Sequence, residues 1–493
     1  MPDEPPQFTI VGAGLAGTLM ACYLGKAGYR VDVYEKRPDP RIHEPPPGRS
    51  INLALSLRGI HALREVGLAD AALAAAIPLR GRMIHDRDGR LAFQPYGKDD
   101  SESINSISRA GLNLLLVNAA ASYPTVRLFF RRRCIGIDLE TATIDLIDDQ
   151  TMQTSRVPCT AVIGADGVYS AVRARMQLQE RFNYQQEYLD YGYKELTIPP
   201  APSPQPLSPE AGARGELLAP LAPEAGERGE LLAPLASQGG RGVGGEGGGF
   251  RLEKHALHIW PRRSFMMIAL PNRDGSFTCT LFWPYEGPNS FAALQNEAEL
   301  RRFFQEQFPD ALPLMPALAE EYRKNPVGPL LTVRCSPWHV RDRIVLIGDA
   351  AHAVVPFLGQ GMNAAFEDCT ILAECLARHG PDREAAFRDF EARRKIHTDA
   401  LAELCLLNFI EMRDRVGSRL FLLRKRFENS LHKLFPRWYL PLYTMIQFTR
   451  IPYADAWRRA RRQDRIVGAI LSGLLALLVL GMLWLLFGEG AWR

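Results

Sequence analysis

The sequence predicts an α/β protein with an open, mostly parallel sheet surrounded by helices, a β-rich layer, a helical C-terminal part and a C-terminal transmembrane helix. Three observations support this prediction. An apolar strand pattern near the N-terminus runs into a glycine-rich turn and a helical pattern. A second buried strand near residue 344 ends in Gly-Asp, and residues 466–487 form a run of 22 residues without a charge.

The composition limits the classes of protein that fit the chain. With 493 residues, 46% of them hydrophobic, the chain can bury a sizeable core and fill two or three domains. The net charge of +4 is too small to indicate a nucleic-acid partner. The eight cysteines form no Cys-x-x-Cys pair, so we expect free thiols and no metal site. The opening MPDEPPQ is acidic and proline-rich, which argues against a cleaved targeting peptide.

The first element is a strand from Phe8 that leads into the motif Gly-x-Gly-x-x-Gly. In this motif Gly12 permits a tight turn, Gly14 lets the backbone approach a pyrophosphate, and Gly17 lets the following helix pack on the strand. The helix N-terminus then favours the anion. A lone motif of this kind could be an ordinary glycine turn. Here a second strand ends in Glu35, 18 residues after Gly17, where a carboxylate for ribose hydroxyls is expected.

Two later segments distinguish FAD from NAD. The first is a strand pattern that ends in Asp166-Gly167. In the second, a buried strand at 344–347 delivers Asp349 to a strand end, and the loop 356–361 opens a helix from about Met362. The N-terminus of that helix would stabilise negative charge on a reduced flavin. Each could be an incidental Gly-Asp turn, but the three motifs in this order predict an FAD-binding, Rossmann-like domain.

The C-terminal apolar run predicts a membrane anchor. At 1.5 Å per residue, residues 466–487 span the roughly 30 Å hydrocarbon core of a bilayer. The alternative is a buried core helix. Arginines precede the run, so the positive-inside bias predicts a catalytic body on the cytoplasmic side of a bacterial inner or mitochondrial outer membrane. A solvated helix face is the other explanation for these arginines, which are Arg458, Arg459, Arg461, Arg462 and Arg465.

One internal segment differs from the rest of the chain. The sequence PEAGARGELLAPLA at 209–222 is repeated almost unchanged at 223–236 and is followed by a glycine-rich stretch. Two copies are too few for a solenoid. We expect residues 201–249 to be a disordered insertion and assign no chemistry to it.

The order of the three motifs resembles that of the class A flavoprotein monooxygenases, which have no separate nicotinamide domain. This chain has no second Gly-x-Gly-x-x-Gly motif. The resemblance covers nearly the whole chain outside the repeat insertion and is closest to the kynurenine-hydroxylating branch of the family. It is carried by GRSINLALSLRG (48–59), GRMIHD (81–86), QPYG (94–97), ALHIWPRRSFMMIALPN (256–272), FTCTLFWP (277–284), NFIEMR (408–413) and PLYTM (441–445).

The resemblance implies the reaction. NADPH would reduce FAD, O2 would add at flavin C4a, and the distal oxygen of the hydroperoxyflavin would pass to the ring carbon beside the aniline amine of L-kynurenine. The product, 3-hydroxykynurenine, belongs to tryptophan degradation towards quinolinate and NAD. The preference for NADPH over NADH rests on the resemblance, and no side chain is identified as an acid or a base.

The resemblance also implies a substrate pocket. The resemblance implies that the substrate-binding arginine of the family corresponds to Arg82 and its partner tyrosine to Tyr96. A guanidinium with a phenol suits an amino-acid carboxylate. Asn408 and Glu411 are three residues apart, so on a helix they would share one face and could meet the amino group and ring carbonyl. For Phe357, plain core packing is an equal alternative. The implied substrate residues are Arg82, Tyr96, Asn408, Glu411, Tyr443 and Phe357.

The motifs and the resemblance together imply a larger set for FAD. His258 and Trp260 are expected to line or support the pocket, and His352 is expected to be structural. The predicted FAD-binding residues are Gly12, Gly14, Ala16, Gly17, Glu35, Arg37, Ala54, Arg109, Cys134, Asp166, Asp349, Gly361, Met362 and Asn363.

The expected domains are discontinuous in sequence. The FAD-binding domain takes 8–75, 103–187 and 331–378, and the substrate domain takes 76–102 and 188–330 with the insertion. A helical region at 379–465 and the anchor at 466–487 follow.

Three alternatives to this function remain open. A flavin reductase or halogenase would keep the flavin motifs, but a halogenase is expected to carry WxWxIP, which is absent. An epoxidase of a lipid should have an apolar pocket without the set Arg82, Tyr96 and Asn408. A non-catalytic flavin-binding protein is the third alternative.

Overall fold

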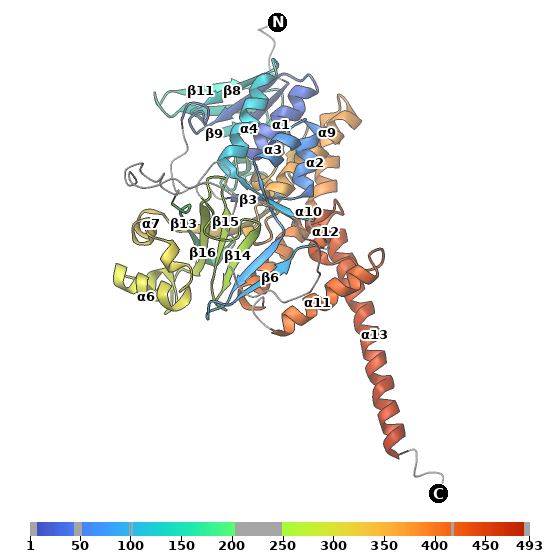
Figure 1. Ribbon diagram of the computed structural model, residues 1–493. Helices are drawn as coiled ribbons and strands as arrows, with labels where there is room; N and C mark the ends of the chain where they lie inside the picture. Colours follow the sequence, from blue (N-terminus) through green and yellow to red (C-terminus); the bar gives the residue numbers. More distant parts are fainter. Residues whose placement is uncertain are drawn as a thin grey trace, which may run out of the picture.

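The computed structural model describes residues 7–43, 52–97, 99, 102–202, 249–415 and 419–487. The predicted insertion at 201–249 lies outside the described residues except at its two ends. Figure 1 shows a body with two main sheets, one above the other, and a single long helix, α13 (Tyr453–Phe487), that extends away from it.

The first sheet has six strands in the order β18-β19-β12-β1-β2-β8. All neighbours are parallel except the pair β18 and β19. Parallel strands are covered on both faces, which explains why the central strands β1, β12 and β19 are fully buried and almost continuously apolar. Their carboxyl ends therefore meet along one edge. The strands are β1 (Phe8–Val11), β2 (Val31–Glu35), β8 (Val126–Phe130), β12 (Val162–Gly164), β18 (His339–Val340) and β19 (Ile344–Leu346).

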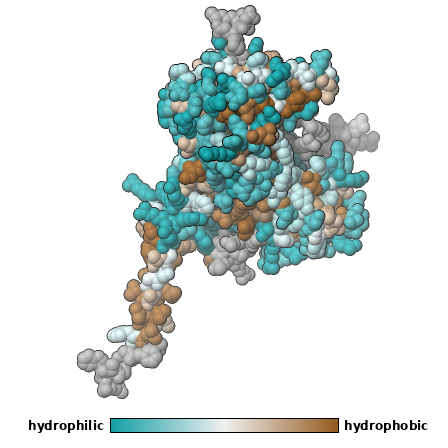
Figure 2. All heavy atoms as spheres, turned by 180° about the vertical axis from the view of Figure 1, so that it is seen from behind, coloured by the Kyte–Doolittle hydropathy of each residue, from teal (hydrophilic) through white to brown (hydrophobic). Residues whose placement is uncertain are grey.

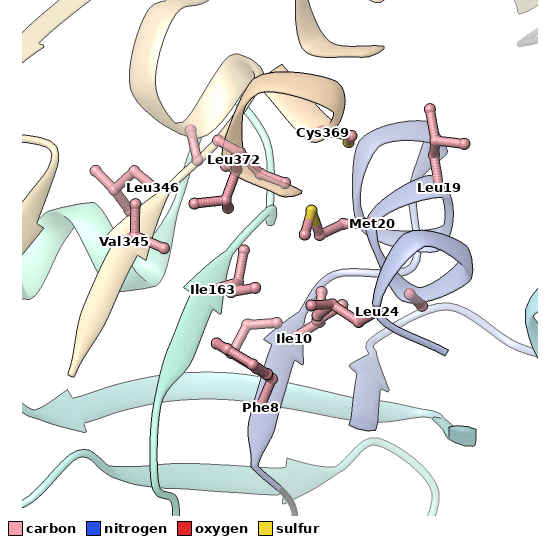
Figure 3. Close-up of a cluster of buried hydrophobic side chains, with 14 of the residues drawn as sticks. Phe8, Ile10, Leu19, Met20, Leu24, Ile163, Val345, Leu346, Cys369 and Leu372 are labelled. Carbon is pink, nitrogen blue, oxygen red and sulfur yellow. The ribbon is translucent and has the colours of Figure 1, made fainter. Parts of the chain in front are cut away.

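The largest apolar core lies between this sheet and helices α1 (Leu15–Lys26) and α9 (Gly361–His379). Figure 3 shows strand residues such as Ile10 and Ile163 pointing towards Met20 of α1 and Leu372 of α9. All four side chains are fully buried. The core therefore holds the two helices against the strands whose ends carry the motifs.

The second sheet has seven strands in the order β17-β13-β16-β15-β14-β5-β6. β5 pairs with β14 in parallel, so a segment before residue 96 joins a sheet built mainly from residues after 183. Apart from this pair, neighbours are antiparallel. The strands are β5 (Gly81–His85), β6 (Leu91–Pro95), β13 (Asn183–Ile198), β14 (Ala256–Pro261), β15 (Met266–Pro271), β16 (Phe277–Pro284) and β17 (Gly328–Ser336).

The two faces of this sheet bury different clusters, as the period of two along each strand requires. Ile84 and Ile259 belong to a cluster shared with α10 (Arg383–Ile410). Trp260 and Trp283 point to the other face, where α6 (Glu297–Gln307) and α7 (Leu318–Lys324) cover them. The face towards α10 is the one that carries the predicted substrate residues.

Two small sheets and several short helices complete the body. The three-stranded sheets have the orders β3-β7-β4 and β11-β10-β9. Their strands are β3 (Asn52–Leu55), β4 (Ile77–Leu79), β7 (Ile104–Ser108), β9 (Arg132–Asp138), β10 (Thr143–Asp148) and β11 (Thr154–Pro158). The other helices are α2 (Leu57–Glu65), α3 (Ala69–Ala74), α4 (Arg109–Ser122), α5 (Ala171–Met176), α8 (Asp349–His352), α11 (Arg419–Leu434) and α12 (Leu442–Phe448).

A network of buried charges joins α2, α9 and α10. Arg58 of α2 donates to Glu367 of α9 at 2.7 Å. Arg394 of α10 donates to the same carboxylate and also to Asp368 at 2.8 Å. All four side chains are buried. Because a charge inside a protein must be paired, the four residues fix the relative positions of the three helices.

Asp368 also holds the turn that leads into α8. It accepts from the backbone N–H of Gly348 at 2.8 Å and pairs with His352 at 2.5 Å. Gly348 has a φ of 60°, which favours glycine. Burial alone would raise the pKa of Asp368, but His352 and Arg394 lower it below its ordinary value. The structural role expected for His352 agrees with this contact.

Helix α13 starts inside the body. Tyr453 is fully buried and donates to Gln360 at 2.9 Å, and the guanidinium of Arg58 lies 4.2 Å from its ring centroid. Gln447 of α12 accepts from Gln360 at 2.7 Å and donates to the carbonyl of Leu358 at 2.9 Å. The base of α13 is therefore joined to the loop before α9.

The rest of α13 leaves the body. It is the one helix among the described residues that is long and apolar enough to cross a membrane, with a mean hydropathy of 2.6 over its most apolar window, which is wholly unburied. Figure 2 shows its apolar surface below the body. The helix is continuous from Tyr453, so the arginines and the apolar run predicted as separate segments belong to one rod.

We expect Asp368→Ala to lower the free energy of unfolding by about 3–5 kcal/mol, because it leaves Arg394 partly unpaired in the core. Thermal unfolding measured in detergent checks this. The matched control is Glu297→Ala, which removes an exposed ion pair with Arg301 and should cost no more than about 0.5 kcal/mol. Equal melting temperatures for the two variants would contradict the role given to the buried network.

Candidate functional site

The glycine motif forms the turn between β1 and α1. Gly12 has a φ of 103°, and a Cβ there would lie 2.5 Å from the carbonyl oxygen of Ala165. A Cβ at Gly17 would lie 1.9 Å from the carbonyl oxygen of Gly12. A Cβ at Gly14 would meet nothing within 4 Å. The first two glycines are thus required by the fold, whereas Gly14 borders open space at the N-terminus of α1.

Two acidic residues lie at the ends of the strands beside this turn. Asp166 follows β12, and one carboxylate oxygen accepts from the N–H of Ala171 at 2.7 Å. Its other oxygen is buried without a hydrogen-bond partner among the described residues, and burial raises the pKa of this carboxyl. Asp349 follows β19 and is exposed at the same edge. Both carboxylates are therefore free to accept hydroxyl donors of a ligand.

Glu35 ends β2 next to the glycine turn. Its carboxylate accepts from the N–H of Ala13 at 2.7 Å and from the guanidinium and N–H of Arg37 at 2.8 and 2.9 Å. Burial alone would raise the pKa of Glu35, but Arg37 and Ala13 bring it below its ordinary value. A charged carboxylate is therefore held directly beneath the turn.

The N-terminus of α9 points into the same region. Gly361 and Met362 form its first turn, and Asn363 is fully buried. Asn363 accepts from the N–H of Ser56 at 2.9 Å and donates to the carbonyl of Ala54 at 2.8 Å. A helix of 19 residues places unpaired N–H groups and a partial positive charge at this end.

The remaining predicted FAD residues lie at varied distances from the turn. Ala16 of α1 touches the Gly-Asp turn, since a Cβ on Gly348 would lie 3.3 Å from its Cβ. Cys134 of β9 is half-buried, and burial followed by the charge of Asp166 raises the pKa of its thiol to about 12. Arg109 starts α4 and is exposed. These three residues stay predictions for the cofactor.

Taken together, the edge of the first sheet fits a flavin dinucleotide. It offers open space at Gly14, an unpartnered carboxylate oxygen on Asp166, the exposed Asp349 and the positive end of α9. A purely apolar ligand would leave these groups without hydrogen-bond partners. Among the described residues, no group of three His, Cys, Asp or Glu side chains could hold a metal ion.

A second set of residues lies on the adjacent face of the seven-stranded sheet. Arg82 of β5 is buried, and its guanidinium lies 4.9 Å from the ring centroid of Tyr443 and 5.6 Å from that of Tyr96. The two tyrosine rings stack with centroids 5.3 Å apart. Residues from β5, the end of β6 and α12 thus converge, although α12 lies more than 300 residues after the two strands in sequence.

The charge of Arg82 is incompletely balanced. Burial alone would lower its pKa, but attraction to Tyr443, Tyr96 and Glu411 raises it above the ordinary value, so the guanidinium is charged. Burial raises the pKa of both phenols, which are therefore neutral near pH 7. Glu411 also lies 3.9 Å from Lys425. Moreover, Nε of Arg82 is buried without a hydrogen-bond partner among the described residues.

The segment that carries Asn408 and Glu411 differs from the expectation. The sequence predicts one helix face for the pair, but α10 ends at Ile410 and Glu411 begins a π-helical turn, Glu411–Arg415. A π turn contains more residues than an α turn, so it changes the direction of the side chains that follow. Asn408 donates to the carbonyl of Phe357 at 2.7 Å, while the negative charge of Glu411 attracts the guanidinium of Arg82 and raises its pKa.

Phe357 lies in the core between the two sets. Its ring stacks on Phe409 with centroids 4.2 Å apart and is tilted against Phe282 at 4.9 Å. Ala54 connects the sets more directly, because it packs with the Tyr96 cluster and its carbonyl accepts from Asn363. The candidate cofactor and substrate residues are therefore neighbours.

His258 and Trp260 lie on the opposite face of the sheet from Arg82. Nδ1 of His258 lies 2.8 Å from Nε2 of His85, and Nδ1 of His85 lies 2.5 Å from the carboxylate of Asp310. Trp260 donates to Asp310 at 3.0 Å. Burial lowers the pKa of His258 to about 4. These residues support β5 and β14 from behind and do not line the pocket.

Sequence reasoning missed the groups that hold the site together. Arg58, Glu367, Asp368 and Arg394 form the buried network, and Gln360 with Gln447 fixes the loop before α9. A charged Glu-Asp pair within an apolar helical stretch, FEDC at 366–369, was the available signal for two of them. Nothing local indicates the glutamine pair.

The comparisons with known proteins begin with a family model described as "FAD binding domain", which matches residues 7–220 and 298–403. The kynurenine 3-monooxygenase of Myxococcus xanthus is 44% identical, over 94% of this chain and 91% of its own length. That of Salinispora tropica is 46% identical over 96% and 95%, and that of Xanthomonas campestris 43% over 94% and 92%.

Solved structures with the same fold have lower sequence identity. One is 2-methyl-3-hydroxypyridine-5-carboxylic acid oxygenase, with a TM-score of 0.60 at 19% identity, covering 86% of this chain and 96% of its own. Another is PqsL of Pseudomonas aeruginosa in complex with 2-aminobenzoylacetate, also at 0.60 and 19%, covering 84% and 98%. These structures confirm the predicted α/β fold.

The open space at Gly14 gives a test of the cofactor site. Gly14 has extended backbone angles that any residue adopts. Gly14→Val should therefore fold but fill the space for the pyrophosphate, lowering FAD affinity at least about 10-fold, or about 1.4 kcal/mol. The ratio of flavin to protein absorbance and circular dichroism check this. Gly17→Ala should instead lose the fold as well, and a fully flavinated Gly14→Val would contradict the assignment.

Proposed function

The chain belongs to the kynurenine 3-monooxygenases, a family of FAD-dependent monooxygenases, and from this premise we propose that it hydroxylates L-kynurenine to 3-hydroxykynurenine with NADPH and O2. The buried, incompletely paired Arg82 is the observation that carries the substrate assignment. A guanidinium in this state selects an anion, and its planar donors match a carboxylate.

The residues around Arg82 suit the rest of an aromatic amino acid. The stacked rings of Tyr96 and Tyr443 leave their phenols beside the guanidinium, where they can donate to the same carboxylate. Glu411 supplies a negative charge for an ammonium group. Leu257 and Leu270 pack with this cluster and offer an apolar surface to an aromatic ring.

When bound, FAD supplies the electron transfer from NADPH and the activation of O2. The open backbone at Gly14 would hold its pyrophosphate against the N-terminus of α1, in a turn shaped by Gly12 and Gly17. Glu35 and Arg37 would hold the adenosine end, and Asp349 the ribityl chain. The start of α9 would face the flavin ring. This chain's own contribution is to bind and orient the substrate beside the cofactor and to exclude water.

Water exclusion is supported by the aromatic wall between α10 and the sheet. The ring of Phe357 stacks on Phe409 and packs at a tilt against Phe282, and all three side chains are buried. Asn408 fixes the backbone of Phe357 through its carbonyl. A reactive oxygen species in such a site is protected from side reactions with solvent.

Helix α13 supports a membrane anchor. The apolar segment from Ile466 is long enough to cross a bilayer, and the preceding arginines favour a body on the cytoplasmic side. The bilayer would be a bacterial inner or a mitochondrial outer membrane. A lipid as the substrate is disfavoured, because burying Arg82 beside an apolar substrate would leave its charge without a partner.

An activity assay tests the substrate. Kynurenine should stimulate NADPH oxidation by the full-length protein in detergent, and 3-hydroxykynurenine should appear in the product analysed by chromatography. A fatty acid or a phenol without an amino-acid group should give neither effect, since neither offers both charges to Arg82 and Glu411. Oxidation of NADPH at the same rate with and without kynurenine would refute the assignment.

The role of Arg82 has its own test. Arg82→Met keeps the volume but removes the charge-assisted hydrogen bonds, worth about 1.5–3 kcal/mol, so the KM for kynurenine should rise by about 10- to 100-fold. FAD content should stay unchanged. Arg90→Ala, an exposed arginine at the tip of the same hairpin, is the control and should keep the KM of the parent protein. An unchanged KM in Arg82→Met would remove Arg82 from the pocket.

A further inference from the structure

Helix α11 carries an exposed apolar stripe. Leu423, Phe427 and Leu434 are 60%, 43% and 72% exposed. Their spacings of four and seven residues place them on one side of the helix. The stripe continues beyond the helix with Phe435 and Trp438, which are 54% and 42% exposed. An exposed stripe of this size calls for a partner.

The contacts of α11 place the stripe at a defined height along α13. The guanidinium of Arg424 lies 3.7 Å from the carboxylate of Asp464, and Gln463 donates to the carbonyl of Trp438 at 3.2 Å. Asp464 is two residues before Ile466, where the uncharged run begins. At 1.5 Å per residue, the stripe meets α13 within about 5 Å of that point. Figure 1 shows α11 beside the upper part of α13, at the lower end of the body.

Basic side chains accompany the stripe. Arg426, Lys433 and Arg437 are exposed on or just after α11. In α13 the arginines Arg458, Arg459, Arg461, Arg462 and Arg465 occupy the turns directly before the apolar run. An apolar helix face with basic flanks is the pattern of a helix that lies in the interface of an anionic bilayer.

We propose that α11 and residues 435–438 lie in the surface of the membrane that α13 crosses, with the stripe of Leu423, Phe427 and Leu434 among the lipid acyl chains and the basic residues at the headgroups. This inference rests on the proposed anchor. The membrane is the occupant because the stripe meets α13 at the height where its apolar surface begins, so a bilayer around α13 must reach the stripe.

The structure therefore assigns two kinds of membrane contact to the chain. Helix α13 enters the hydrocarbon, and α11 rests in the interface beside it. The two together restrict the tilt of the body, because a body that tilted away would lift the stripe out of the lipid. A second copy of this chain is the other conceivable occupant, and the experiment separates it from lipid.

Spin labels on the full-length protein in vesicles of phosphatidylcholine and phosphatidylglycerol test the proposal. One label is attached at a time to Leu434→Cys, Leu480→Cys or Leu178→Cys. Leu178 has the same exposed fraction as Leu434, 72%, but follows α5, which packs against β9 in the upper part of the body (Figure 1). Leu480 lies within the apolar run of α13. The unsubstituted chain gives the background from its native cysteines.

The label at 434 should be relaxed more by O2 than by a water-soluble nickel chelate, at an immersion depth of about 5–10 Å. The label at 480 should lie deeper, and the label at 178 should respond to the chelate as in water. If the label at residue 434 is in water and the label at residue 480 is in lipid, the proposal for α11 is overturned and the membrane anchor α13 stands. Both labels in water would overturn the anchor as well. Spin–spin broadening at 434 in dilute vesicles would identify a second copy and also overturn the proposal.

Discussion

The paired carboxylates Glu367 and Asp368, held between Arg58 and Arg394, are the constraint on which the rest of the structure depends. They lie in the middle of α9 and fix the positions of α2, α10 and the Gly-Asp turn after β19. Arg58 also donates to the carbonyl of Ile451, which fixes the chain before α13. Buried ion networks seldom add much net stability, because desolvation offsets the attraction. Their contribution here is to permit one arrangement of helices and exclude others.

That arrangement is what brings the two halves of the site together. The start of α9 belongs to the cofactor region, and the loop before it carries Phe357 into the aromatic wall on the substrate side. Asn363 fastens this junction to β3 by accepting from Ser56 and donating to Ala54, so the small sheet of β3, β4 and β7 is tied to both regions. A displacement of α9 along its axis would disturb the cofactor edge and the pocket together.

The sequence alone predicts the parts of the molecule that depend on local pattern. The strand β1 and the turn with Gly12 and Gly17 form as expected, because consecutive residues of the sequence determine an apolar strand and a tight turn. The β19 strand and the start of α9 agree with expectation within one or two residues for the same reason. Only the family resemblance placed Tyr443 beside Arg82 and Tyr96, since no spacing rule joins residues that are hundreds of positions apart.

Other features could not be predicted because their causes are not local. Arg58 and Glu367 are 309 residues apart, and a buried arginine looks like any surface arginine until its partner is known. The π turn at Glu411–Arg415 interrupts the helix at residues that include no glycine or proline. The sequence left open whether His258 lines or supports the pocket, and the alternation of side chains along β14 places it on the opposite face of the sheet, where it supports β5.

The length and continuity of helix α13 affect how the body can move relative to the helix end. Its 35 residues form an unbroken rod about 52 Å long, and its first turn is embedded in the body through Tyr453. In the proposed anchored state, a flexible linker would let the body rotate freely above the lipid and sample every orientation. A stiff helix whose first turn is buried in the body would instead leave rotation about the membrane normal as the main freedom, so every copy would present the same side to the aqueous phase. Encounters with soluble reactants would then occur through one fixed face, at a constant distance from the bilayer.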